Sequence, residues 1–317
     1  MMWACLLLSG GVVILWKSAD WLVDGAVGLA KLFGVSPLII GLTIVAMGTS
    51  APEVAASIAA AVRGVGNVAI GNVYGSNIAN LALVGGLAAL IRPIRVQLRT
   101  LSGEMPVMIA VALLLWPVLA DGGLSRPEGI ILLSIFAGLI VLTIFTSHRE
   151  PEALQCEATS GKKDVKRSVL FVIVGLAGLA LGADMAVRGA VFIGERVGLS
   201  KAVIGLTIVA IGTSLPELVT CVVAAIKGQH DISIGNLVGS NIFNTLLVVG
   251  TAGVVRPFGE IASRLAGGVD YWTMIAVSGV FVLLAAIGRR VGRAGGILLL
   301  LGYIGYMVYL LVYTAGV

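Results

Sequence analysis

Long runs of apolar residues alternate with short polar segments along all 317 residues of the chain. Several of these runs contain no charged residue and are long enough to cross a hydrocarbon core about 30 Å thick. They cover residues 32–52, 130–147, 271–288 and 294–317. The pattern predicts a polytopic membrane protein built from α-helices.

The ten expected spans divide into two sets of five. In the first half they cover roughly 2–32, 36–62, 67–91, 103–120 and 127–146. In the second half they cover roughly 166–196, 200–226, 231–255, 268–287 and 294–315. Residues 147–165 are the only long polar stretch, so we expect them to link a first repeat, 1–146, to a second repeat, 166–317.

Two blocks of sequence occur twice, at a constant offset of 164 residues. "GLTIVAMGTSAPE" (41–53) and "GLTIVAIGTSLPE" (205–217) share eleven of thirteen residues, and "AIGNVYGSNIAN" (69–80) and "SIGNLVGSNIFN" (233–244) share eight of twelve. This is an internal duplication. Because each copy has an odd number of spans, the copies enter the membrane in opposite directions, as in many secondary transporters. The expected fold is therefore all-α, with ten transmembrane helices arranged as two inverted five-helix repeats.

Composition agrees with this fold and excludes other classes. The chain is 58% hydrophobic and 12% charged, whereas soluble domains are about a quarter charged. The net charge of +5 does not indicate nucleic-acid binding, because most basic residues lie in short loops. Thirteen fall on one side of the expected membrane and six on the other, which predicts that both termini lie outside and the linker in the cytoplasm. The three cysteines have no CxxC spacing and indicate neither a disulfide framework nor a zinc site.

Two glutamates, Glu53 and Glu217, lie well inside apolar spans. A charged residue at such a depth costs roughly 2.5–3.5 kcal/mol and normally faces a cavity and a partner. The preceding Pro52 and Pro216 each remove a helix hydrogen bond and free a backbone carbonyl. Hydroxyls stand three and four residues before each glutamate and share its helix face. They belong to Ser50 and Thr49 in the first copy and to Ser214 and Thr213 in the second.

The second block adds polar groups on another helix. Ser76 and Asn80 are four residues apart, as are Ser240 and Asn244, so each pair projects from one face. For the other asparagines of the block, the pattern fits helix packing equally well. Carboxylates, hydroxyls, amides and freed carbonyls form an all-oxygen site, which suits hard cations such as Ca²⁺ or Na⁺.

The paired motifs G-T-S-x-P-E and G-N-x-x-G-S-N-I-x-N resemble the α-repeats of the calcium/cation antiporter superfamily, specifically its prokaryotic Na⁺/Ca²⁺ exchanger branch. The resemblance implies that Glu53 and Glu217 hold Ca²⁺, with help from the backbone carbonyls of Thr49 and Thr213. It implies flanking Na⁺ sites built by the same glutamates with Ser50, Ser214, Ser76, Ser240 and the carbonyls of Ala46 and Ala210. The last motif position, an amide or acid in the family, corresponds to Asn80 in the first copy and Asn244 in the second. Some relatives carry Asp at the position of Asn244, whereas this chain has Asn at both.

The resemblance further implies a plasma-membrane antiporter that exchanges Ca²⁺ for Na⁺ by alternating access, with the first and sixth helices sliding over the rest. We expect no enzymatic activity, no cofactor, and a monomer in the lipid bilayer. Exchange of Ca²⁺ or another divalent cation for H⁺ is the main alternative, followed by K⁺-assisted exchange. A cation channel would use the same ligands, and counter-transport in vesicles would distinguish it. An intramembrane aspartyl protease would use Asp20 and Asp184 but leaves both glutamate motifs unexplained.

Overall fold

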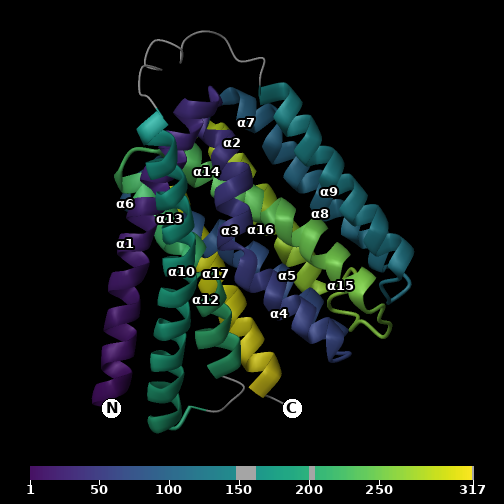
Figure 1. Cartoon of the computed structure of the whole chain (residues 1–317). Coiled ribbons are helices and arrows are strands. Elements are labelled where there is room, and N and C mark those ends of the chain that lie inside the picture. Colours follow the sequence, from purple (N-terminus) through teal and green to yellow (C-terminus); the bar gives the residue numbers. More distant parts are fainter. Residues whose placement is uncertain (148–161, 200–203, 316–317) are drawn as a thin grey trace.

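The computed structural model describes residues 1–147, 162–199 and 204–315, which are almost entirely helical (Figure 1). The first half contains α1 (Met2–Phe33), α2 (Pro37–Ile40), η1 (Gly41–Val45), α3 (Ala46–Thr49), α4 (Ala51–Val62), α5 (Gly66–Ile78), η2 (Ala79–Val84), α6 (Gly85–Ile91), β1 (Ile94–Arg95), α7 (Leu98–Ser102), α8 (Glu104–Leu119) and α9 (Arg126–Ser147). The second half contains α10 (Lys162–Arg196), η4 (Gly205–Val209), α12 (Ala210–Thr213), α13 (Leu215–Ile226), α14 (His230–Phe243), η5 (Asn244–Val248), α15 (Val249–Val255), α16 (Val269–Ala286), η6 (Ile287–Arg289), β2 (Arg290–Val291) and α17 (Arg293–Ala315).

The described residues contain eight apolar helices long enough to cross a membrane and two bent helix pairs that count as one span each. The bends measure 46° between α3 and α4 and 54° between α12 and α13. The resulting ten spans, five in each half, confirm the predicted fold class. The boundaries differ slightly, since α10 begins at Lys162, inside the segment expected as linker. Residues 148–161 of that segment lie outside the described part of the chain.

The two spans that carry the second motif form the centre of the molecule. In Gly66–Ile91 and His230–Val255, 72% of the apolar window is buried, against 11–33% in the other unbroken spans. Their glycines and alanines allow this close packing. The short strands β1 and β2 pair antiparallel and join the loops at the end of the bundle opposite the termini. Both termini lie at the same end, as an even number of spans requires (Figure 1).

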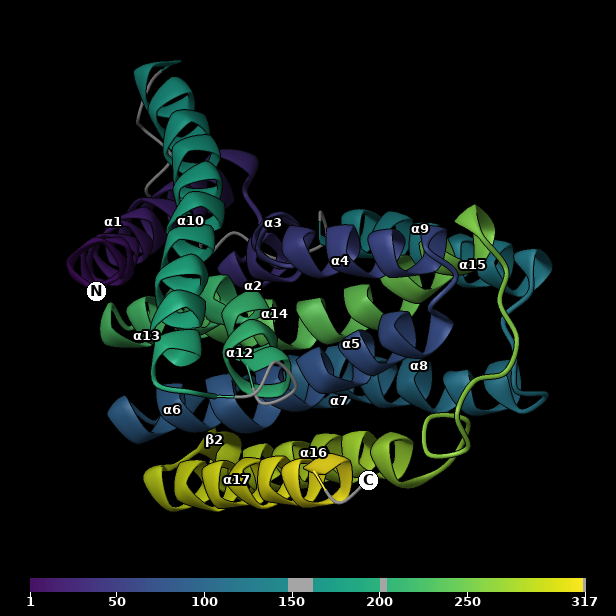
Figure 2. The same ribbon diagram turned by 90° about the horizontal axis from the view of Figure 1, so that it is seen from below.

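Helices α1 and α10 pack along one another at one edge of the bundle (Figure 2). Their contact is close because it is made by glycines: a Cβ at Gly11 would lie 2.7 Å from the carbonyl oxygen of Gly182, and one at Gly189 equally close to that of Ala4. The 32 residues of α1 span about 48 Å at 1.5 Å per residue. Since this exceeds the hydrocarbon thickness, we expect the helix to tilt or to extend beyond the hydrocarbon core.

Candidate cation site

The glutamate motifs interrupt their helices at equivalent serines. The backbone of Ser50 has φ −81° and ψ 5°, and that of Ser214 has φ −89° and ψ 6°. New helices begin immediately afterwards, with proline in the first turn, where its missing N–H is tolerated. Glu53 and Glu217 therefore stand in the first turns of α4 and α13, where the helix dipole favours a negative charge.

Both glutamate side chains are fully buried, with 0% of each exposed. One oxygen of Glu217 accepts a 3.0 Å hydrogen bond from the hydroxyl of Ser50, which joins the two halves of the chain. The other three carboxylate oxygens have no hydrogen-bond partner among the described residues. Ser50, which donates to Glu217, stands three residues before Glu53 on the same helix face, so the two carboxylates lie in the same part of the core. A buried pair of this kind is costly without a cation between or beside its members.

Neutral oxygens from the predicted set are also buried without hydrogen-bond partners among the described residues. They belong to the side chains of Ser214, Ser240, Asn80 and Asn244. Asn80 lies in η2, which packs against the helix of Glu217, and Asn244 lies in η5, which packs against the helix of Glu53. Each asparagine segment thus meets the glutamate helix of the other half. In the described part of the chain, no three His, Cys, Asp or Glu side chains cluster around a metal position, so further ligands would have to be neutral oxygens.

The remaining predicted residues occupy unequal environments. The hydroxyl of Thr49 has one hydrogen to donate and lies 3.0 Å from the side-chain oxygen of Asn236 and 3.3 Å from the carbonyl oxygen of Ala46. Thr213 donates to the carbonyl of Ala210 at 3.1 Å. Ala46 and Thr49 are buried, whereas Ala210 is exposed and Thr213 is half-buried.

Thr213 and Ala210 are less buried because they line a cavity of about 570 Å³. We name this cavity the vestibule. Ser76 lines it too, so it reaches the candidate site. Its outer wall includes Asn67, at the start of α5, and Arg264, in the loop between α15 and α16. Because spans alternate in direction, these residues lie at the same end of the bundle as both termini.

Two features of the site had no clear signal in the sequence. The first is π-helical turns at matching positions in the two halves, η1 with η4 and η2 with η5. Such turns occur often at functional sites. The second is a layer of supporting side chains: Asn72 donates to Ser57 at 2.9 Å, and Asn236 donates to the sulfur of Cys221 at 3.3 Å. These pairs are related by the offset of 164, and each ties the second motif to a glutamate helix.

The aspartates of the protease alternative are not brought together as a catalytic pair. Asp20 forms an ion pair with Lys227, while Asp184 pairs with Arg188 on its own helix. Each carboxylate is thus neutralised separately by a cation, and the structure gives the protease interpretation no support.

Known proteins resemble the chain over nearly its whole length. It matches the family described as "Sodium/calcium exchanger protein" over residues 3–145 and 167–312. The inner membrane protein YrbG of Escherichia coli (strain K12) is 39% identical over 319 residues, which cover 98% of this chain and 97% of that protein. The sodium/calcium exchanger MaX1 of Methanosarcina acetivorans is 32% identical over 347 residues, covering 96% and 97%. A structure of the sodium-calcium exchanger NCX_Mj, soaked with Na⁺ and Sr²⁺, matches with a TM-score of 0.85 at 31% identity and covers 97% of this chain and 98% of that one.

Proposed function

The chain belongs to the sodium/calcium exchanger protein family, and on that premise we propose that it exchanges Ca²⁺ for Na⁺ across the cell membrane by alternating access. Membership makes it a multi-pass cation antiporter. Two observations on relatives support the finer assignment: MaX1 is named a sodium/calcium exchanger, and NCX_Mj shares the fold.

The buried pair of Glu53 and Glu217 carries the proposal. Three of their four oxygens have no partner in the described structure, and two carboxylates balance one Ca²⁺. The same carboxylates, shared with neutral oxygens such as those of Ser214 and Ser240, suit several Na⁺ ions instead. Because the two occupancies use the same charges, they exclude one another. Mutually exclusive binding at a site that opens to one side at a time gives coupled exchange.

Each ligand has a proposed role. Glu53 and Glu217 bind Ca²⁺ together with the backbone carbonyls of Thr49 and Thr213. The serine hydroxyls, the two asparagine amides and the carbonyls of Ala46 and Ala210 complete the Na⁺ sites. Since both halves of one chain supply this set, we propose that a single copy is the transporting unit.

Transport by the purified protein in liposomes tests the coupling ion. We expect an outward Na⁺ gradient at fixed pH to drive Ca²⁺ uptake, with saturation by both ions. A pH gradient in Na⁺-free medium should drive none. The reverse result, uptake with H⁺ alone, would establish H⁺/Ca²⁺ exchange by the same carboxylates. Uptake that needs no counter-ion would indicate a channel.

We propose that the vestibule faces the outside of the cell, with both termini, and that the linker is cytoplasmic. Cys156, which lies outside the described residues, provides the test. In a Cys5→Ser, Cys221→Ser background, an impermeant thiol reagent added to intact cells should label Cys156 only after the membrane is opened. Labelling in intact cells would reverse the orientation.

A further inference from the structure

The vestibule wall carries one positive and one negative side chain. Among the described residues that line it, only Arg264 and Asp270 are charged. The others are apolar or neutral and polar. Among the described residues of the wall, these two side chains are therefore the charges that a cation in the vestibule meets.

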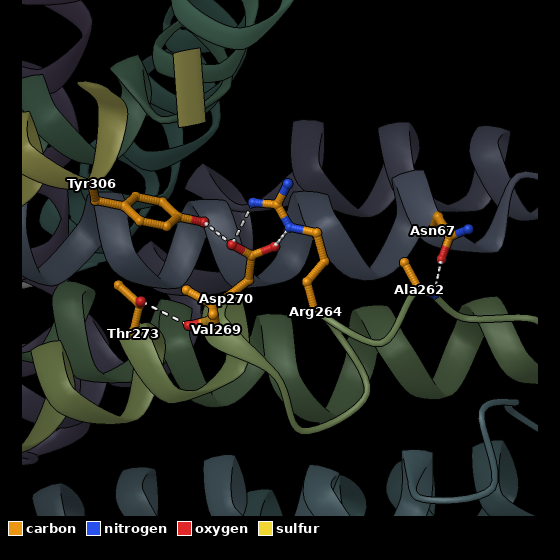
Figure 3. A network of polar contacts seen from close by, with 7 residues as sticks. All are labelled: Asn67, Ala262, Arg264, Val269, Asp270, Thr273 and Tyr306. Carbon is orange, nitrogen blue, oxygen red and sulfur yellow. Dashed lines mark hydrogen bonds and ion pairs between the residues drawn. The ribbon is translucent and has the colours of Figure 1, made fainter. Parts of the chain in front are cut away.

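The pair is held in a defined geometry (Figure 3). Arg264 Nε lies 2.6 Å from Asp270 Oδ2, and Nη2 lies 2.9 Å from Oδ1. Tyr306 of α17 donates a third hydrogen bond to Oδ1 at 3.2 Å. The side chain of Asp270 is 6% exposed, against 33% for that of Arg264. The guanidinium thus covers the carboxylate on the side that water can reach.

The segment that carries Arg264 is fixed independently at its other end. Asn67 of α5 accepts a 2.7 Å hydrogen bond from the backbone N–H of Ala262 (Figure 3). The backbone N–H of Asp270 also donates to the carbonyl of Arg264 at 3.1 Å. The loop therefore has holding contacts that do not depend on the charges of the ion pair.

The first half carries charges in the corresponding segment, at the opposite end of the bundle. Gly103 and Gly268 are the N-caps of α8 and α16, and Arg99 and Arg264 each stand four residues before their glycine. The first turn of each helix carries a carboxylate, that of Glu104 in α8 and that of Asp270 in α16. Because the vestibule is lined by the segment of the second half, an effect of the Arg264–Asp270 pair on cation entry is confined to the vestibule side of the membrane.

We infer that the Arg264–Asp270 pair is a specificity-determining element that sets the apparent affinity for cations entering from the vestibule side. Asp270 attracts cations, and Arg264 cancels most of that attraction. The inference rests on the proposed function, in that the entering ion is the Ca²⁺ of the exchange cycle. Fixed charges near a narrow path raise or lower the local concentration of an ion in a way that depends on salt.

The test measures the KM for Ca²⁺ separately from each side, in intact cells and in inverted membrane vesicles, at low ionic strength. Arg264→Gln should lower the KM from the vestibule side by about three- to tenfold, and Asp270→Asn should raise it by a similar factor. The double variant should return to within about twofold of the wild type. The KM from the opposite side should stay unchanged, and high salt should shrink both shifts.

Two further variants separate charge from structure. Tyr306→Phe removes a hydrogen bond without removing a charge, and Arg264→Lys keeps the charge but loses the two-pronged geometry. Both should retain a wild-type KM. If single variants shift the KM in the same direction, or lower only the maximal rate, the pair is structural and the inference is wrong. Should Asp270→Asn fail to fold, the KM of Arg264→Gln is compared with that of Arg264→Lys. A lower KM in Arg264→Gln alone supports the inference, and an equal KM in the two variants contradicts it. If transport proves to be H⁺-coupled in the wild type, the coupling proposal fails while these KM comparisons stand.

Discussion

The two copies of the glutamate motif are nearly identical in sequence but differ in their surroundings. In the first half, η1 and α3 pack tightly on α14: a Cβ at Gly239 would lie 2.6 Å from the carbonyl oxygen of Leu42. The equivalent glycine beside the second-half motif is Gly75 of α5, and a Cβ there would meet nothing within 4 Å among the described residues. The vestibule occupies that space. A duplicated sequence thus adopts a closed arrangement in one copy and an open one in the other.

Individual side chains show the same difference. Val45 is 0% exposed, and its counterpart Val209 is 41% exposed. Thr49 donates to Asn236 of the other half, whereas Thr213 donates to the carbonyl of Ala210 on its own helix and lines the vestibule with Asn72. The proposed cycle requires the two copies to exchange these arrangements, so its second state would have the first copy open and the second closed.

The largest expected effect comes from the feature that both halves share. Glu53→Gln or Glu217→Gln leaves one carboxylate facing a divalent ion in a buried site, so we expect Ca²⁺ exchange to fall at least about 100-fold. Expression and folding should be largely retained, because the carboxylates have few partners in this structure. Glu128→Gln, in the first turn of α9, is the matched control and should transport normally. Exchange near the wild-type rate in Glu53→Gln would remove the basis for the site.

Substitution of the two glycines tests whether their contacts keep one copy closed and the other open. Gly239→Ala places a methyl group against backbone in the closed copy, which costs about 1–3 kcal/mol in this state. The methyl group of Gly75→Ala fits without contact in this state but would obstruct closure of the vestibule. The reporter is Val209→Cys, labelled from the vestibule side in a Cys5→Ser, Cys156→Ser background. Gly239→Ala should slow labelling about tenfold and Gly75→Ala should speed it, and both should lower turnover. Equal labelling in all three proteins would show that these glycines do not govern opening.

The serines next to the glutamates offer a smaller contrast. Ser50 donates to Glu217, while Ser214 has no hydrogen-bond partner in the described structure. We expect Ser50→Ala and Ser214→Ala each to raise the Na⁺ concentration for half-maximal exchange about three- to tenfold, because each removes one of the proposed neutral ligands. Only Ser50→Ala should also lower thermal stability in the absence of ions, by about 1–3 kcal/mol. Ser240→Ala should behave like Ser214→Ala, with a higher Na⁺ concentration for half-maximal exchange and unchanged thermal stability. Loss of Ca²⁺ affinity with unchanged Na⁺ dependence would contradict the assignment.

The sequence predicted ten spans, the inverted duplication and the burial of both glutamates, because these follow from hydropathy, from the constant offset and from the cost of a charge in lipid. It did not predict that Ala46 is buried and Ala210 exposed, since the two flanking sequences are almost the same. That difference depends on how α1, α10 and the central spans are packed in one state. The pairing of Asp20 with Lys227 was not predicted either, because Lys227 is 207 residues away in sequence.

The smallest expected effect concerns an ion pair that holds α1 to the end of α13. Lys227 lies 2.6 Å from Asp20 and 2.7 Å from Asp24, both on α1. Partial burial lowers the pKa of Lys227, but the hydrogen bonds and charges of the two aspartates outweigh this and leave the pKa above its ordinary value. The equivalent of Lys227 is Arg63, whose side chain is exposed and forms no ion pair within the described residues.

Lys227→Gln should therefore weaken the contact of α1 with α13 and slow Val209→Cys labelling about two- to fivefold, since the pair is partly exposed. The effect should shrink in high salt, and Lys227→Arg should restore wild-type labelling. Arg63→Gln is the matched control and should change labelling less than about twofold. At the offset of 164, the position of Asp24 corresponds to Arg188, which already pairs with Asp184. Arg63 would therefore form only a weak ion pair in the opposite state. An Arg63→Gln effect as large as that of Lys227→Gln would mean that the two halves are held by equivalent contacts, and that the asymmetry between them lies only in the glycine-lined vestibule.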